Sequence, residues 1–195
     1  MDSESPTYLV TDIEADGRVP GANSMISIAS AAIGHDGADR GQFVINIDPV
    51  DGLSADPGTM EWWSTQPDAW AEATRDPVPA AEAVEAFTSW AQSLPGSRVF
   101  VANPLSFDGA YVGWYLDRYG QLPLFDQPRR PGLTVGGLDL PTLVMGVKGW
   151  PFERCHLDYY PSEWLGGYQH SHRAIDDALG YAHLLAMLLA EQSAG

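Results

Sequence analysis

The spacing of apolar residues divides the first quarter of the chain into short extended segments. Residues 8–13, 25–33 and 42–47 are rich in Ile, Val and other apolar residues, which predicts three strands. A turn rich in Gly and Asp over residues 34–41 joins the last two. We therefore expect the chain to open with a βββ meander.

Helical periodicity dominates the remainder of the chain. Residues 79–92 and 174–191 place apolar side chains on one helical face. Further elements are expected as short helices within 57–73, over 106–119 with Ser106 as the cap, and over 138–147, and as a strand over 98–102. Residues 124–137 and 150–169 lack a period and are predicted to be irregular. This order predicts an α/β fold with a mixed central sheet flanked by α-helices.

The length and composition are those of one globular unit. With 195 residues and 45% hydrophobic residues, the chain suits a single domain over residues 1–195, with flexible tails at 1–6 and 192–195. No apolar run is long enough to span a bilayer, and the acidic N-terminus lacks the features of a signal peptide. The single cysteine, Cys155, fits a reducing compartment. We therefore expect a cytoplasmic protein without a membrane partner.

The charge balance is strongly acidic. Ten Lys and Arg against 26 Asp and Glu give a formal charge of −16. Proteins that hold long duplexes usually present a basic face, and Arg129-Arg130 is the nearest approach to one here. If the substrate is a nucleic acid, metal ions must supply much of the positive charge, and only a short stretch is gripped. An acidic surface that merely confers solubility explains the composition equally well.

Two acidic residues stand at the end of the first predicted strand, in the segment YLVTDIEADG. Asp12 and Glu14 are two residues apart, so their side chains point to the same face. Adjacent carboxylates repel, and burial of either one raises its pKa. A divalent cation such as Mg²⁺ removes this penalty, because it prefers carboxylate oxygen ligands. A solvent-facing acidic strand end is an equally good explanation of this pair alone.

Two further segments carry candidate chemistry at helix starts. Asp108 falls in the first turn of a predicted helix that follows a strand and a loop, which places it near the end of the sheet. His172 lies at the threshold of the last helix, with Asp176 and Asp177 in its first turn. Histidine can act as a general base near neutral pH. The preference of acidic residues for helix N-termini accounts for each segment when it is taken alone.

Taken in order, these segments resemble a known set of motifs. Asp12-Ile13-Glu14, Asn103 through Phe107-Asp108, and His172 through Asp177 are similar to the three exonuclease motifs of the DEDDh superfamily. This superfamily of proofreading-type 3′→5′ exonucleases includes oligoribonuclease, RNase T and exonuclease VIII-like enzymes. Helix geometry alone pairs His172 with Asp176, four residues on. The spacing of the family motif selects Asp177 instead.

The resemblance implies a ribonuclease-H-like fold and a two-metal mechanism. Two Mg²⁺ or Mn²⁺ ions would lie among the four carboxylates, with Asp12 bridging both, Glu14 and Asp177 completing one site, and Asp108 supporting the other. His172 would take a proton from the attacking water. The substrate would be single-stranded or short RNA or DNA with a free 3′ end, with RNA slightly favoured, and the product a nucleoside 5′-monophosphate. Small domains of this family are often homodimers, so a homodimer is also implied.

The resemblance also suggests residues that bind the substrate. The loop after Glu14 contacts the 3′-terminal nucleotide in relatives, which points to Ala22, Asn23 and Met25. The adjacent Trp62 and Trp63 are able to stack on bases, although a tryptophan pair in a helix is more often part of the core. Phe107 is expected in the core or at the floor of the nucleotide pocket.

Two other functions compete with the exonuclease. The first is a ribonuclease-H-like module that binds nucleic acid without catalysis. It is disfavoured because all five expected positions are filled, and metal binding would discriminate it. The second is a zinc hydrolase built on His170 and His172, for which the sequence indicates no clear third ligand. Zinc content and the response to chelators would separate it from the exonuclease.

Overall fold

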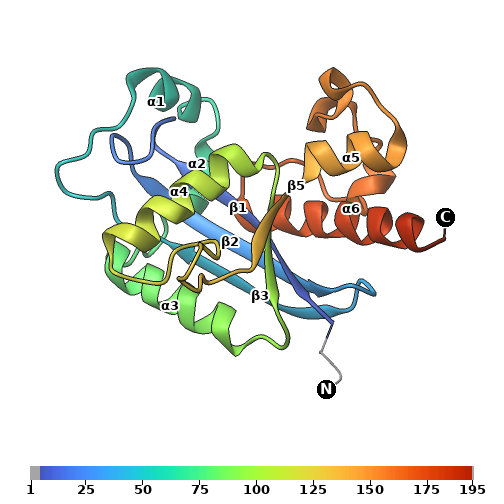
Figure 1. The fold of residues 1–195 in the computed structure, drawn as a ribbon. Coiled ribbons are helices and arrows are strands. Elements are labelled where there is room, and N and C mark those ends of the chain that lie inside the picture. The colour runs from blue at the N-terminus through green and yellow to red at the C-terminus, as the bar shows by residue number, and fades with distance from the viewer. Residues whose placement is uncertain (1–4, 195) are drawn as a thin grey trace.

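A five-stranded mixed sheet forms the centre of the protein, for which a computed structural model describes residues 5–194. The strand order is β3-β2-β1-β4-β5 (Figure 1). Strands β1 (Thr7–Ala15), β2 (Met25–Gly34) and β3 (Asp39–Asn46) are antiparallel neighbours. Strands β4 (Arg98–Ala102) and β5 (Gly136–Asp139) run parallel to β1 on its other side. The predicted βββ opening and mixed sheet are confirmed.

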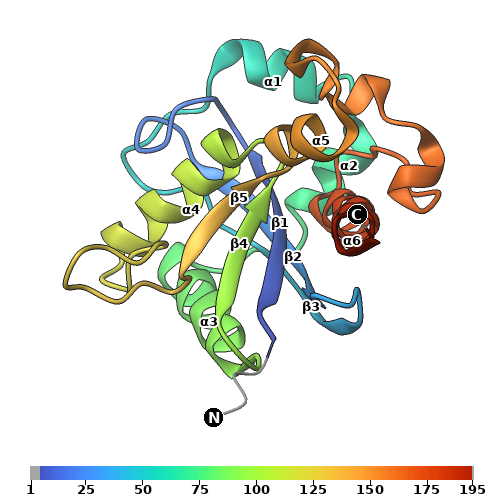
Figure 2. The same cartoon turned by 45° about the vertical axis from the view of Figure 1, so that its right-hand side comes forward.

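Helices cover both faces of this sheet (Figure 2). Helices α3 (Ala80–Ser93) and α4 (Leu105–Arg118) lie on one face. Helices α5 (Leu140–Lys148) and α6 (Ala174–Ala194) lie on the other. Every residue of β1 and β2 is buried, which matches their nearly continuous apolar character.

The alternation of side chains along β1 connects the two layers of the core. Leu9 belongs to the cluster that includes residues of α3 and α4, whereas Val10 belongs to the cluster that includes α5 and α6. Successive strand side chains point to opposite faces, so β1 is the element around which both layers are built. A smaller cluster packs helices α1 (Pro57–Trp63) and α2 (Pro67–Ala73) against Ile26.

Two sequence predictions need correction or completion. The segment expected to be a loop and then a helix from residue 138 instead forms β5 before α5 begins at Leu140. Helix α4 begins at Leu105, one residue before the predicted cap, Ser106. The Leu105 amide donates to Asp139 Oδ1 at 2.9 Å, so a residue from β5 takes the role expected of Ser106.

The ends of the described chain are connected to the rest of the fold. Of the predicted tails, residues 1–4 and 195 lie outside the described residues. Arg40 Nη1 donates to the carbonyl oxygens of Ser5 and Pro6, and α6 continues to Ala194. Within residues 5–194, no helix combines the length and the hydropathy needed to cross a bilayer.

The segment between α5 and α6 is irregular, as predicted. It contains three short 3-10 helices, η1 (Phe152–Arg154), η2 (Leu157–Tyr159) and η3 (Ser162–Leu165). Only a few of its side chains reach the core; Cys155, Tyr160 and Leu165 pack with residues of α6. This segment and α5 form a projection that stands opposite α1, as Figure 1 shows.

Candidate active site

Acidic side chains meet at the end of β1. Asp12 and Glu14 are each 9% exposed and lie two residues apart on the strand, as their spacing predicted. Asp177, from the first turn of α6, joins them. Each of the three offers a carboxylate oxygen, and these atoms all lie within 4.8 Å of one another. A strand and a helix that are far apart in sequence therefore build one group of carboxylates.

Asp108 adds a fourth carboxylate from the first turn of α4. Its Oδ1 atom accepts a hydrogen bond of 3.2 Å from the backbone amide of Ile13, the residue between Asp12 and Glu14. This bond fixes the start of α4 against β1. We call Asp12, Glu14, Asp108 and Asp177 the carboxylate floor.

The carboxylate floor is electrostatically unfavourable without a cation. Burial raises the pKa of Asp12 well above its usual value, and the charges of Asp108, Glu14 and Asp177 raise it further. Burial also raises the pKa of Glu14, with added repulsion from Asp177 and Asp108. Burial raises the pKa of Asp108 to about 7, although the hydrogen bond from Ile13 opposes the shift. Desolvation is the largest cause of all three pKa shifts, and repulsion between like charges adds to the shifts of Asp12 and Glu14.

The donor set fits a hard divalent cation. Among the described residues, Asp177 Oδ2 is a buried oxygen that has no hydrogen-bond partner. Buried polar atoms are nearly always satisfied, so this oxygen indicates a ligand. Mg²⁺ and Mn²⁺ prefer clustered carboxylate oxygens. The residues present therefore fit the metal ions that the sequence motifs implied.

His172 lies beside the carboxylate floor, in the turn before α6. Its backbone has a φ of 55°, a left-handed conformation that few residues other than glycine adopt. Its ring makes edge contacts with Trp62 at 4.8 Å and with His170 at 4.1 Å between ring centroids. Burial lowers the pKa of His172, as does the nearby His170, and Asp177 partly opposes the shift. A neutral imidazole is the form that accepts a proton.

Asp176 and Asp177 are adjacent in sequence but take different positions in the structure. Asp177 points into the carboxylate floor, whereas Asp176 Oδ2 accepts a hydrogen bond of 2.9 Å from Ser171 Oγ. His172 precedes the helix, so the rule that residues four apart share a helix face does not apply to it. The geometry agrees with the motif spacing.

The two tryptophans of α1 occupy different environments. Trp63 is 2% exposed, and its Nε1 donates to the Ala15 carbonyl at 3.0 Å. Trp62 is 39% exposed and lies between the rings of Trp63 and His172. Trp63 therefore anchors α1 to the end of β1, and Trp62 borders the candidate site.

The loop between β1 and β2 presents few free polar groups. The side chain of Asn23 is buried; its Oδ1 accepts from the Val19 amide and its Nδ2 donates to the Ser54 carbonyl. Met25 is buried in the core. Ala22 is exposed, and Phe107 is partly buried against Tyr111. Roles for these residues in substrate binding stay predictions, and Asn23 would have to exchange internal hydrogen bonds to bind a sugar.

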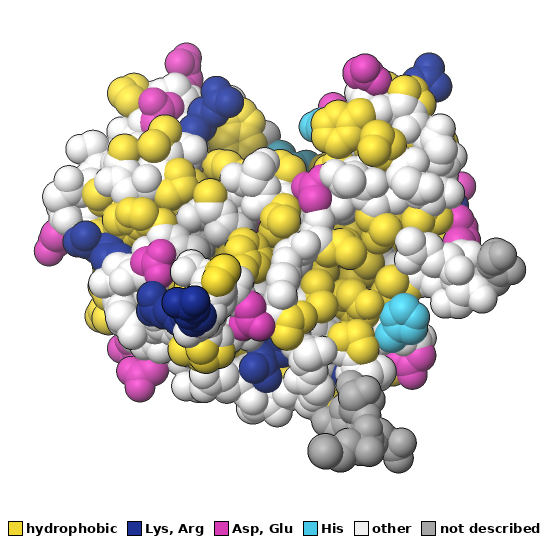
Figure 3. All heavy atoms as spheres, in the orientation of Figure 1, with side chains coloured by type: hydrophobic (Ala, Val, Ile, Leu, Met, Phe, Trp, Pro, Cys, Tyr) yellow, Lys and Arg dark blue, Asp and Glu magenta, His cyan; other side chains and the backbone are white. Residues whose placement is uncertain are grey.

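An open pocket of about 690 Å³ reaches His172, the histidine beside the carboxylate floor. Asn103 and His172 form one side of it, and the segment after α5 contributes Phe152 and Tyr159. Phe152 and Tyr159 are each 56% exposed, and neither ring has an aromatic partner among the described residues. We call these two rings the aromatic wall. Figure 3 shows the surface hollowed between the projections formed by α1 and by α5 with its following segment.

Sequence reasoning missed the aromatic wall. Phe152 and Tyr159 lie in a segment without apolar periodicity, so the sequence does not indicate which residues their rings contact. The one available signal was the presence of aromatic residues in a segment too irregular to bury them all.

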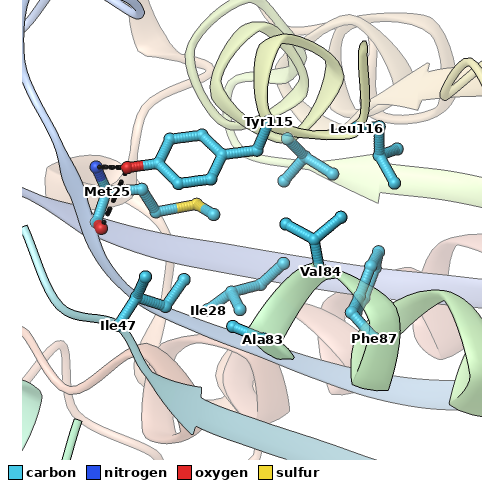
Figure 4. A pocket seen from close by; sticks show the side chains of 9 residues that line it. Met25, Ile28, Ile47, Ala83, Val84, Phe87, Tyr115 and Leu116 are labelled. Carbon is cyan, nitrogen blue, oxygen red and sulfur yellow. Dashed lines mark hydrogen bonds between the residues drawn. The ribbon is translucent and has the colours of Figure 1, made fainter. Parts of the chain in front are cut away.

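A second cavity is a packing feature and not a binding site. Apolar residues from β2, α3 and α4 surround it, including Met25, Val84 and Tyr115 (Figure 4). Its volume of about 10 Å³ reaches only the lower limit for one water molecule, and apolar cavities of this kind stay dry.

Comparisons with known proteins agree with this geometry at the level of the fold. No protein-family model matches the sequence, and no curated protein matches it. The zinc-bound form of the E. coli exonuclease I–single-stranded DNA complex is similar with a TM-score of 0.68 and 17% identity, over 97% of this chain and 41% of exonuclease I. The chain therefore spans about two fifths of the length of that enzyme.

Two further solved structures cover the chain more evenly. The nuclease domain of 3′hExo, a DEDDh family member bound to rAMP, has a TM-score of 0.66 and 9% identity over 97% of this chain and 93% of that domain. A 3′-exonuclease in a structure on recognition of the histone mRNA stem-loop has a TM-score of 0.68 and 11% identity, over 97% and 84%. The protein has the fold of DEDDh exonucleases, as its motifs predicted.

Proposed function

We propose that this protein is a metal-dependent 3′→5′ exonuclease that hydrolyses single-stranded or short nucleic acid to nucleoside 5′-monophosphates. The carboxylate floor carries the proposal. Four buried acids from three separate elements converge on one point, at a cost in electrostatic energy that only a cation offsets. A module that binds nucleic acid without catalysis gains nothing from this arrangement.

The four carboxylates would hold two Mg²⁺ or Mn²⁺ ions. Bound ions of this kind stabilise the charge that develops on the attacking and leaving oxygens of the phosphodiester. The protein itself supplies rigid placement, because β1 carries Asp12 and Glu14 while the Ile13–Asp108 hydrogen bond ties α4 to the same strand. Asp177 enters from α6 with one unpartnered oxygen.

His172 is the proposed general base. It would accept a proton from the water that attacks the terminal phosphodiester, and its ring packs edge-on against that of Trp62 beside the carboxylate floor. Its lowered pKa keeps the imidazole neutral at the pH where the reaction would run. We also propose that Trp62, half-exposed against this ring, limits the movement of His172 and offers an edge to the terminal base.

The shape and charge of the surface favour a single strand. The pocket beside the carboxylate floor has no Lys or Arg among its lining residues, so it is unsuited to gripping the phosphates of a duplex. The aromatic wall instead offers faces on which bases stack. We propose that bases upstream of the scissile phosphate stack on Phe152 and Tyr159. Similar folds are known in complexes with a dA16 oligonucleotide and with rAMP; we favour RNA slightly over DNA as the substrate.

A degradation assay with end-labelled oligonucleotides tests the proposal. The purified protein is incubated with 5′-labelled and 3′-labelled single-stranded RNA and DNA in Mg²⁺, Mn²⁺ or EDTA. We expect stepwise shortening from the 3′ end that EDTA abolishes, with release of nucleoside 5′-monophosphates. Binding of the oligonucleotide by folded protein without shortening in any metal would contradict the proposal and indicate a binding module.

A further inference from the structure

His170 lies at the edge of the candidate active site and is neither a proposed ligand of the Mg²⁺ ions nor the proposed general base. Its Nδ1 atom is 3.0 Å from Asp177 Oδ1, and its ring centroid is 4.1 Å from that of His172. Each of the three residues offers a ligand atom, and these atoms all lie within 4.8 Å of one another. We call His170, His172 and Asp177 the histidine site.

The donor chemistry of the histidine site differs from that of the carboxylate floor. Imidazole nitrogens suit Zn²⁺ and other late transition metals, whereas Mg²⁺ prefers oxygen. With Zn–N and Zn–O distances of about 2.0–2.1 Å, neighbouring ligand atoms of a tetrahedral ion lie roughly 3.3 Å apart. The observed 3.0 Å between His170 Nδ1 and Asp177 Oδ1 is close to that spacing. Two imidazoles and one carboxylate complete three positions and leave one open.

Two further observations point to a ligand here. Asp177 is 4% exposed, and among the described residues its Oδ2 atom has no hydrogen-bond partner. In addition, the left-handed backbone of His172 turns the short His-Ser-His segment so that both rings approach Asp177. The sequence alone showed the His-x-His pair without a third ligand; the fold supplies Asp177.

We propose that the histidine site binds Zn²⁺ and that zinc bound there inhibits the magnesium-dependent nuclease. The inhibition rests on the proposed function, whereas the binding does not. His172 and Asp177 belong both to the histidine site and to the residues proposed for the nuclease reaction. While zinc is bound at the histidine site, these two residues are therefore not free for that reaction. Zinc would use the imidazole nitrogen that otherwise accepts a proton, and it would draw Asp177 away from Asp12 and Glu14. Zinc and Mg²⁺ should therefore compete.

The test compares two histidine substitutions in the full-length protein. His170→Gln removes a ligand of the histidine site only. His156→Gln is the matched control, because His156 is an exposed histidine near the same pocket and outside the site. Zinc binding is measured on EDTA-treated, dialysed protein by competition with a chromophoric chelator, without nucleic acid. Nuclease activity is measured separately at fixed Mg²⁺ with increasing Zn²⁺.

We expect wild type and His156→Gln to bind one zinc ion with the same affinity and to be inhibited by it. In His170→Gln, the affinity for zinc and the inhibitory potency should both fall at least about ten-fold, with activity in Mg²⁺ alone retained. Raising Mg²⁺ should shift the inhibition of wild type to higher zinc concentrations.

Three results would overturn the inference. They are zinc binding unaffected by His170→Gln, equal inhibition of all three proteins, and zinc supporting hydrolysis on its own. If no protein degrades nucleic acid in Mg²⁺, the proposed function fails and the inhibitory role fails with it. The chelator experiment still decides whether the site binds zinc.

Discussion

The carboxylate floor and the aromatic wall lie side by side and are built in opposite ways. The floor takes its side chains from β1, α4 and α6, all buried and tied together through the sheet. The wall comes from short 3-10 helices between α5 and α6, with rings that project into solvent. The difference indicates that bringing several carboxylates together requires rigid strands and helices, whereas stacking on bases requires only exposed aromatic rings.

The two regions also differ in what they cost the folded state. The floor gathers four carboxylates in a desolvated space, which raises the pKa of three of them. The wall exposes apolar area that the core does not use. If the carboxylate floor performs the reaction and the aromatic wall binds the nucleic-acid strand, substitutions in the floor should lower the rate and substitutions in the wall should raise the KM.

The largest effect is expected from a substitution in the carboxylate floor. Asp12→Asn keeps the shape of the side chain but removes the charge of a proposed metal ligand. We expect the rate in saturating substrate to fall by at least about 10³-fold. Single-turnover assays in Mg²⁺ measure this loss, and circular dichroism verifies the fold. A folded Asp12→Asn protein with near wild-type rates would show that the carboxylate floor does not perform the reaction.

The next effect concerns His172 and its pH dependence. His172→Gln should lower the rate by about 10²–10⁴-fold, the usual contribution of a general base. Because its pKa is lowered, the neutral and active form of His172 persists below the ordinary histidine pKa of about 6.5. The rate of wild type should therefore fall only as the pH drops further. This limb of the pH–rate profile should vanish in His172→Gln, and a retained limb would argue for another base.

A stability measurement should show the cost of the floor. The folded pKa of Asp108 is raised to about 7, so the group favours folding below its unfolded pKa of about 3.9 and this contribution is lost as the pH rises towards 7. Asp108→Asn should therefore stabilise the metal-free protein above pH 7, on the order of a few kcal/mol. Its Oδ1 atom still accepts from Ile13.

Thermal unfolding in EDTA at pH 5 and pH 8 tests this sign. The difference in Tm between Asp108→Asn and wild type should be larger at pH 8 than at pH 5. Added Mg²⁺ should raise the Tm of wild type more than that of the variant. A variant less stable than wild type in EDTA at pH 8 would mean that the carboxylate is not under electrostatic strain.

The smallest effect is expected in the aromatic wall. Phe152→Ala should raise the KM for oligonucleotides by about ten-fold, the usual loss of one base–aromatic stacking contact, with kcat nearly unchanged. Hydrolysis of the p-nitrophenyl ester of thymidine 5′-monophosphate, which has no upstream base, should not change. Val44→Ala, which shortens an exposed apolar side chain on β3, is the control. An equal loss of activity on both substrates would show that Phe152 supports the fold and does not bind the nucleic-acid strand.

The sequence predicted the floor better than the wall for physical reasons. The two-residue period of a strand places Asp12 and Glu14 on one face without knowledge of the rest of the fold. The choice of Asp177 over Asp176 needed the motif resemblance, because it depends on where α6 begins. Phe152 and Tyr159 lie in a segment without period, so only three-dimensional packing reveals that they are exposed beside the site.

Other differences arise from tertiary context. Strand β5, with the sequence GGLD, has little intrinsic preference for a strand and forms because β4 offers it a parallel partner. Trp62 and Trp63 are adjacent and alike in sequence, and only the fold, in which Trp63 packs against Ile26 and donates to Ala15, distinguishes the core residue from the exposed one. The roles proposed for Ala22, Asn23, Met25 and Phe107 await experiment.

The neighbouring acids Asp176 and Asp177 provide the most direct test of the central claim that the carboxylate floor makes this protein a 3′→5′ exonuclease. Asp176→Asn and Asp177→Asn are the same chemical change one residue apart, and only Asp177 joins the floor. With a 5′-labelled single-stranded oligonucleotide and Mg²⁺, wild type and Asp176→Asn should both shorten the strand from its 3′ end, and Asp177→Asn should leave it intact. Equal degradation by the two variants, or a loss confined to Asp176→Asn, would contradict the account.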